Sequence, residues 1–307
     1  MAPGPDKLSW RHLKIIIKQD EYLTNIINVA NACINLEHWL NYFKCLSTII
    51  IPKPNKSSYD YAKMFCSIVL LNTLDKLIEK VIAKRIQFMV ANNNFIHPSQ
   101  LGSLKFKSTI DAGVVLIYIV RSSWAKGKST STLAFDISQF FPSLNYNLLM
   151  SILSKVSLES KMSNFFVNYL VQRKMNYIWN NMQSPDFEVN ISIGQELALS
   201  SILSALYLTL FLYILEKHLK NLKIPISILF FVDNGLIIAQ NKFILSSNSQ
   251  LFCSYNVLSN LLIDFGLVIE HGKTEIFHFN RSHGAFNPPP LNLTPLGDFV
   301  LRTSGNT

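Results

Sequence analysis

The chain has 307 residues, and 49% of them are hydrophobic, which excludes a disordered chain and allows one large or two to three small domains. Its net charge of +9, from 28 basic and 19 acidic residues, favours a polyanionic partner, nucleic acid first and an anionic membrane second. Only 15% of the residues are charged, and a basic surface with no such partner fits the same totals.

The four cysteines are scattered and form no Cys-x-x-Cys pair, and the seven histidines lack the spacing of metal ligands. This pattern predicts reduced thiols in an intracellular protein, located in the nucleus or the cytoplasm.

The first half of the chain predicts helices that alternate with short strands. Proline and glycine mark an opening loop, and β-branched residues before a basic, proline-rich turn indicate a strand. A Ser-x-x-Asp sequence is typical of a capping box at the start of a helix. In order, the predicted elements are the loop Ala2–Asp6, helical patterning up to residue 44, the strand Thr48–Ile51, the basic turn Pro52–Lys56, a helix over 71–85, a polar loop over 91–99, and a helix over 112–124 capped by Ser108–Asp111.

The second half predicts more strands, several of them apolar and short. In order, the predicted elements are a strand over 133–137, a helix capped by Asn145 or Asn147, a helix around 165–170, strands over 177–179 and 187–193, a long apolar helix over 197–215, strands over 224–231 and 236–239, a helix over 257–265 and a strand over 276–279. Beyond Arg281 the chain is rich in proline and asparagine, which predicts irregular structure.

The stretch Leu197–Leu215 contains no charged residue and is about as long as a membrane span. Ser200, Ser204 and Thr209 interrupt it, and a helix buried in a large core has the same composition. The buried helix is the favoured interpretation, and a membrane span remains the alternative.

Two acidic residues stand at the ends of apolar strands, and they are 97 positions apart. Asp136 interrupts the strand over 133–137, and Asp233 follows the strand over 224–231. A buried carboxylate costs several kcal/mol unless a partner or a metal compensates it, and two at neighbouring strand ends would form an oxygen-rich pocket for Mg²⁺. Val232–Gly235 also fits an ordinary type I′ hairpin turn, and Asp136 also fits a strand end that caps the next helix.

Taken in order, the motifs resemble the reverse transcriptase domain of non-LTR (LINE-type) retrotransposons over nearly the whole chain. The segments that carry this resemblance are Ala2–Asp6, Ile51–Lys56, Leu70–Leu77, Gln100–Gly102 with Lys107–Thr109, Phe135–Leu144, Gly194–Ser200, Phe231–Asn234 and Gly272–Glu275. The resemblance implies an α+β fold with right-hand polymerase fingers and palm, in which an antiparallel palm sheet is backed by helices and the thumb is missing. It implies an extension over 1–44, fingers over 45–131, a palm over 132–287 with 146–193 partly in the fingers, and an irregular tail over 288–307.

The implied activity is RNA-directed DNA polymerisation, with an RNA template, a DNA primer and deoxynucleoside triphosphates as partners and no membrane. Asp136 and Asp233 would chelate two Mg²⁺ ions, with Mn²⁺ as a substitute, and the carbonyl of Ile137 would add a ligand unless it serves the sheet. Asn234 occupies the place of the second aspartate of the family's hairpin.

Five further residues would contact the nucleotide. Phe141 would lie under the sugar and exclude a 2′-hydroxyl, although a core aromatic fits the same position. Lys53 and Lys56 would contact the triphosphate or the template, or else belong to a solvated loop. Gln195 would contact the nucleotide or template base, and Lys273 would protonate or pair with the leaving pyrophosphate unless it is a surface lysine.

Four departures from the family pattern predict impaired catalysis. Asn234 removes one of three carboxylates, and Cys66 stands where an arginine usually grips the triphosphate. Glu196 replaces a glycine, and Ser201 replaces a helix-start proline. Together with the missing thumb, these changes predict a degenerate, truncated copy. The alternatives are a module that binds nucleic acid without turnover and an unstable relic, and the oligomeric state stays open.

Overall fold

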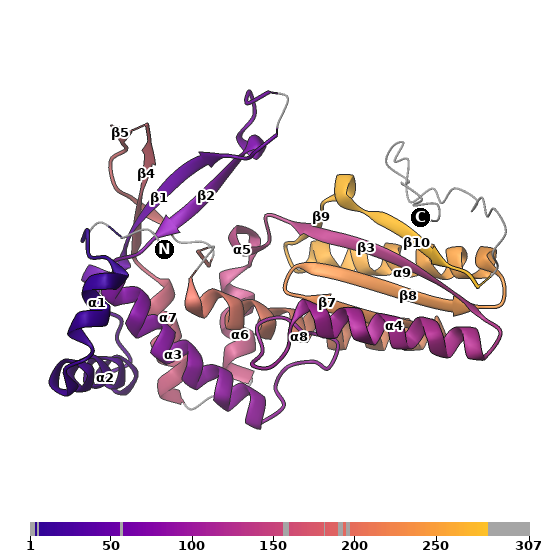
Figure 1. Ribbon diagram of the computed structural model, residues 1–307, viewed down its shortest axis with the longest axis horizontal. Helices are drawn as coiled ribbons and strands as arrows, with labels where there is room; N and C mark the ends of the chain where they lie inside the picture. The colour runs from indigo at the N-terminus through magenta and orange to yellow at the C-terminus, as the bar shows by residue number, and fades with distance from the viewer. Residues whose placement is uncertain are drawn as a thin grey trace. The chain divides into compact units, whose positions relative to one another are not determined.

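The computed structural model describes residues 4, 6–55, 58–155, 160–180, 182–189, 193–194 and 197–281. The chain forms two compact units. Unit 1 comprises Met1–Asn93 and Phe141–Leu203, and unit 2 comprises Asn94–Phe140 and the described part of Ser204–Thr307. Each unit contains one β-sheet that packs against helices (Figure 1). The fold is therefore α+β, as the sequence predicts.

Unit 1 contains a five-stranded sheet in the order β2-β1-β4-β5, and β6 pairs with β4. Strands β1 and β4 run parallel and the other pairs antiparallel. Trp39 packs edge-on against Phe165 and Tyr169 between the helices of this unit. Its elements are α1 (Trp10–Ile16), α2 (Asp20–Asn35), η1 (Asn41–Lys44), β1 (Cys45–Pro52), η2 (Ala62–Met64), β2 (Phe65–Leu70), α3 (Thr73–Asn92), α6 (Tyr146–Lys155), α7 (Ser160–Leu170), β4 (Arg173–Trp179), β5 (Met182–Gln183) and β6 (Phe187–Val189).

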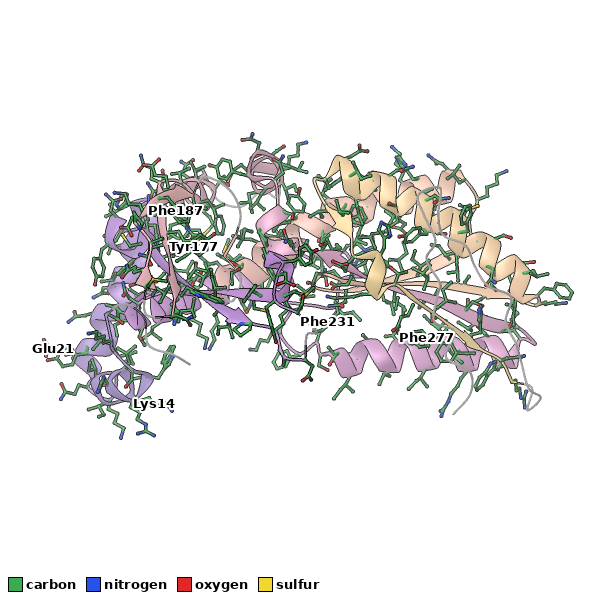
Figure 2. All side chains as sticks on the ribbon, turned by 90° about the horizontal axis from the view of Figure 1, so that it is seen from above. Lys14, Glu21, Tyr177, Phe187, Phe231 and Phe277 are labelled. Atoms are coloured by element: carbon green, nitrogen blue, oxygen red, sulfur yellow. The ribbon has the colours of Figure 1, made fainter. Side chains whose placement is uncertain are left out.

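Unit 2 contains an antiparallel sheet in the order β10-β3-β8-β7, and β9 pairs with β3. Helices α4 and α9 lie on opposite sides of its strands (Figure 2). Because both faces are covered, β3 is buried along most of its length, with Leu133 and Phe135 at its centre. The elements are α4 (Thr109–Ala125), β3 (Ser129–Ser138), β7 (Ile226–Phe231), β8 (Asn234–Asn241), α9 (Ile244–Asp264), β9 (Val268–Ile269), η3 (His271–Lys273) and β10 (Glu275–Phe279). The short helix α5 (Phe140–Ser143) follows β3.

Helix α8 (Ala198–Asn221) is the apolar stretch of the sequence. It is the one helix among the described residues that is long and apolar enough to span a membrane, and most of it is buried inside the protein. Tyr207 and Phe211 pack edge-on against Phe265, and residues 202–209 are all buried, which explains why this part of the helix is apolar on every side.

A buried carboxylate from α3 holds the start of α8 within unit 1. Glu79 is 1% exposed and accepts hydrogen bonds from the Tyr169 hydroxyl and, at 3.3 Å, from the Leu199 N–H. Burial raises the pKa of Glu79, and the nearby Arg173 charge opposes that rise. The carboxylate therefore supplies an acceptor to the first turn of α8, whose N–H groups have no partner within the helix.

Most predicted elements are confirmed, and their bounds shift. The capping box at Ser108 and Asp111 opens α4, and Asn145 caps α6 by accepting from Leu148 N–H at 3.0 Å. The predicted helix over 257–265 is wrong at its start, because α9 begins at Ile244. Strand β2 was not predicted from the sequence. Its backbone pairs residue by residue with β1, from Ser47 opposite Leu70 to Pro52 opposite Phe65.

Candidate active site

The two acidic residues at the strand ends meet in unit 2. In the ladder between β3 and β8, Asp136 lies opposite Asn234, and the Ile137 N–H donates to the Asp233 carbonyl at 3.2 Å. Asp233 lies in the turn that joins β7 to β8, two residues after Phe231, which Figure 2 labels. The structure therefore brings together, at one end of the sheet, two carboxylates that are 97 positions apart in the sequence.

The hairpin between β7 and β8 is confirmed, but the type I′ turn that the segment Val232–Gly235 also fits is not formed, because Asn234 and Gly235 belong to β8. Phe231 pairs with Asn234, so Val232 and Asp233 form the two-residue turn and Asn234 opens β8. Val232 has a φ of 59°, whereas the φ of Asp233 is not positive. A positive φ at the first turn residue alone indicates a type II′ turn, because a type I′ turn has a positive φ at both residues.

Gly235 lies within the sheet and is needed there for space rather than for turning the chain. A Cβ at this position would lie 2.1 Å from the Phe135 ring, which packs edge-on against Phe230. The glycine of the predicted turn is therefore a packing residue beneath the site.

Lys273 lies beside the carboxylates at the end of η3. Its ammonium donates a hydrogen bond to Asp136 Oδ2 and forms an ion pair with it. The Lys273 side chain is 66% exposed and that of Asp136 is 17% exposed, so solvent reaches the pair from the lysine side. The Asp136 carboxylate raises the pKa of Lys273, which stays protonated at neutral pH.

The carboxyl group of Asp233 is half-buried in the turn. Burial raises its pKa, and the charge of Asp136 raises it further, while Lys273 and a hydrogen bond from Asn234 oppose the change. The Asn234 amide donates to Asp233 Oδ1 at 3.1 Å. Two acidic groups that disfavour each other's charge form a site that gains from a bound cation.

The donor set fits a hard divalent cation that substrate oxygens also ligate. Mg²⁺ in polymerase-type sites is commonly bound by one or two carboxylates together with substrate phosphates. Asp136 and Asp233 supply that number, and among the described residues no cluster of three acidic, histidine or cysteine side chains could hold a metal by itself. Ile137, proposed to add its carbonyl, lies in β3 opposite Ile269 with a side chain that is 2% exposed.

Among the predicted nucleotide contacts that the structure describes, Lys53 and Phe141 lie in unit 1 and Lys273 lies in unit 2. Phe141 accepts a hydrogen bond from the Ile193 N–H at 3.3 Å, which ties the segment after β3 to the segment before α8. A Cβ at Gly194 would lie 2.8 Å from Leu197 Cδ1, so a side chain there would require the Leu197 side chain to shift. Lys53 follows β1, where its N–H donates to the Met64 carbonyl.

Three residues discussed from the sequence, Lys56, Gln195 and Glu196, lie outside the described residues. The three other departures from the family pattern, Asn234, Cys66 and Ser201, lie among the described residues. Cys66 is an exposed residue of β2 opposite Ile51. Ser201 lies in the first turn of α8, where its hydroxyl donates to the Ala198 carbonyl at 3.2 Å.

Comparison with known proteins places this arrangement in context. The family described as reverse transcriptase (RNA-dependent DNA polymerase) matches residues 51–297. No curated protein matches the chain.

Solved structures with a similar fold include three structures of telomerases from two Candida species. A Candida tropicalis telomerase truncated from its C-terminal domain has 13% identity and a TM-score of 0.56, with 79% of this chain and 52% of that chain covered. Telomerase complexes with a fragment of telomeric RNA, from Candida tropicalis and Candida albicans, have 15% and 12% identity and TM-scores of 0.55 and 0.54. These two matches cover 81% and 80% of this chain but 43% and 44% of the telomerases, so the chain spans about half the length of its structural relatives or less.

Proposed function

The chain belongs to the reverse transcriptase family, and from that premise we propose that it is a weakened RNA-directed DNA polymerase domain of the non-LTR retrotransposon type. Its substrates would be deoxynucleoside triphosphates and a primed RNA template. The observation that carries this proposal is the meeting of Asp136 and Asp233 at one end of the sheet, with Asn234 in the ladder position opposite Asp136.

The two aspartates would hold Mg²⁺ or Mn²⁺, which when bound supplies charge for activating a primer hydroxyl and for stabilising a leaving pyrophosphate. Asp136 is held by the β3–β8 ladder, and Asp233 is held by the bond between its carbonyl and the Ile137 N–H. The backbones of both aspartates are thus held by the sheet, and cation binding requires ordering of the two side chains only.

In this proposal Lys273 pairs either with Asp136 or with the phosphates of the substrate. Without substrate its ammonium pairs with Asp136, and a polyphosphate that enters beside the carboxylates offers a more highly charged partner. Lys273 would then neutralise the phosphate while Asp136 turns to the cation.

The weakness is proposed from the charge of the site. An amide oxygen at Asn234 can ligate a cation but brings no negative charge, and in this structure the amide nitrogen donates to Asp233. Electrostatic groups of this kind are worth roughly 10²–10³ in turnover. Binding of nucleic acid does not depend on that carboxylate, because phosphate contacts come from basic side chains.

Primer extension on poly(rA) with an oligo(dT) primer, dTTP and either Mg²⁺ or Mn²⁺ tests the proposal. We expect the unaltered chain to extend the primer slowly and only with the template present. The extension rate should rise at least tenfold in Asn234→Asp, and Asp136→Asn should show no extension. Rapid primer extension by the unaltered chain would contradict the proposal that its polymerase activity is impaired. Salt-dependent binding of the primed template without extension, in Asn234→Asp as well, would instead indicate a nucleic-acid-binding protein without turnover.

A further inference from the structure

We propose that Gln100 is a positioning residue for the candidate active site, because its side chain holds Val232 in a left-handed conformation and so sets the direction in which Asp233 leaves the turn. This inference rests on the proposed function, since it assigns a role at the same site. Gln100 belongs to the loop that precedes α4, and it is 132 positions away from the residue it binds.

The conformation of Val232 needs an external cause. Its φ of 59° lies in the region that glycine occupies freely and that a β-branched residue almost never adopts. A type II′ turn normally has glycine at this first position. A strained residue next to a candidate metal ligand persists only where the surrounding structure holds it in place.

Gln100 supplies that support with both ends of its amide. Its Oε1 accepts from the Val232 N–H at 3.1 Å, and its Nε2 donates to the Val232 carbonyl at 3.3 Å. Gln100 is 0% exposed and Val232 is half-buried, so water does not reach the glutamine side of these two bonds. A single side chain thus pairs with both backbone groups of the strained residue, and the turn cannot rotate without breaking both bonds.

The backbone beside Gln100 fixes its own position against the hairpin. The Phe230 N–H donates to Ser99 at 2.7 Å, and the Leu101 N–H donates to the Phe230 carbonyl at 2.8 Å. Gly102 donates its N–H to Gln100 Oε1 at 2.8 Å, and a Cβ at Gly102 would lie 2.4 Å from the Val232 nitrogen. The segment 99–102 therefore follows the end of β7 closely and leaves no room for the turn to move towards it.

Two readouts test this role, and one of them needs no metal. The first is the exchange rate of the Ile137 amide, measured by NMR, because this amide bonds to the Asp233 carbonyl and reports the position of the turn. The second is the affinity for Mn²⁺, measured by electron paramagnetic resonance of the free ion. We expect Gln100→Leu, which removes the hydrogen bonds made by both ends of the amide, to raise the exchange rate and weaken Mn²⁺ binding by about tenfold each, a change that corresponds to about 1.4 kcal/mol.

The decisive variant adds Val232→Gly to Gln100→Leu. Glycine adopts a positive φ without strain, so the double variant should recover most of both losses, whereas a purely packing role for Gln100 predicts no recovery. Val232→Asn, which also tolerates positive φ, repeats the rescue without the added freedom of glycine.

Gln240→Leu is the matched control. It removes a glutamine whose Nε2 donates to Ile119 and Ser123 at the opposite end of the same strand pair, and it should leave both readouts unchanged. Unchanged Ile137 exchange in Gln100→Leu, or losses that glycine at 232 does not repair, would overturn the proposal. Absence of Mn²⁺ binding by the unaltered chain would count against the proposed function alone, because the exchange readout still decides the role of Gln100.

Discussion

Gly235→Ala should destabilise unit 2 although it adds a single methyl group. Gly235 lies between Phe135 of β3 and Phe230 of β7, in register with both. The Phe135 ring covers the glycine, with its Cζ at 2.1 Å and its two Cε atoms at 2.6 Å from the place of an added Cβ. The ring is 3% exposed and packs edge-on against Phe230 at 5.5 Å between centroids, so it has little space into which to retreat.

The size of the effect follows from these distances. Carbon atoms in contact normally lie about 3.5 Å apart or more, so the ring must move by about 1.4 Å, the difference from 2.1 Å. Overpacking of this kind costs about 1–3 kcal/mol in a dense core. Because Asp136 follows Phe135 directly, the same movement would displace the candidate metal ligand.

Phe135→Leu makes the test specific. The smaller side chain leaves room for the methyl group, so the double variant should be more stable than the sum of the two single effects by about 1–2 kcal/mol. Hydrogen exchange of peptides from β8, followed by mass spectrometry against urea concentration, measures unfolding of unit 2 separately from unit 1. A Gly235→Ala protein within about 0.5 kcal/mol of the parent, or strictly additive effects, would refute the packing argument.

Three further predictions concern buried or partly buried carboxylates. Glu79→Ala should destabilise unit 1 by about 3–5 kcal/mol and deprotect peptides that include Leu199, and full protection there would contradict the capping role. Burial raises the pKa of Asp75 to about 7, above the ordinary 3.8, so the ionised form costs stability as pH rises. The melting temperature of Asp75→Asn minus that of the parent should therefore increase from pH 4 to pH 8. A difference that does not change with pH would refute this. Burial and a neighbouring carboxylate also raise the pKa of Asp233, so Asp233→Asn should melt higher in metal-free buffer at pH 7 and lose any stabilisation by Mn²⁺. A lower melting temperature of Asp233→Asn than of the parent in metal-free buffer would count against this prediction.

Local patterns predicted much of the fold, because they record preferences of short segments. The capping box at Ser108 and the asparagine cap at Asn145 satisfy nearby N–H groups, so the sequence alone locates the starts of α4 and α6. Apolar strands that end in Asp136 and Asp233 likewise predicted two acidic strand ends. These features need no knowledge of distant residues.

The exact turn of the hairpin could not be predicted in this way. Asn234-Gly235 has the stronger local preference for a turn, yet both residues lie in β8, and the turn falls on Val232 and Asp233. Phe135 occupies the space above Gly235, and that contact joins residues 100 positions apart. Local preference was therefore overridden by packing.

The sequence by itself determined the kinds of elements, the family resemblance and the identities of the acidic residues. Only the tertiary structure decided that Lys273 pairs with Asp136 and that Gln100 binds both backbone groups of Val232. The physical reason is that these partners come from segments about 130 positions or more apart, and their hydrogen bonds exist only once the sheet has assembled.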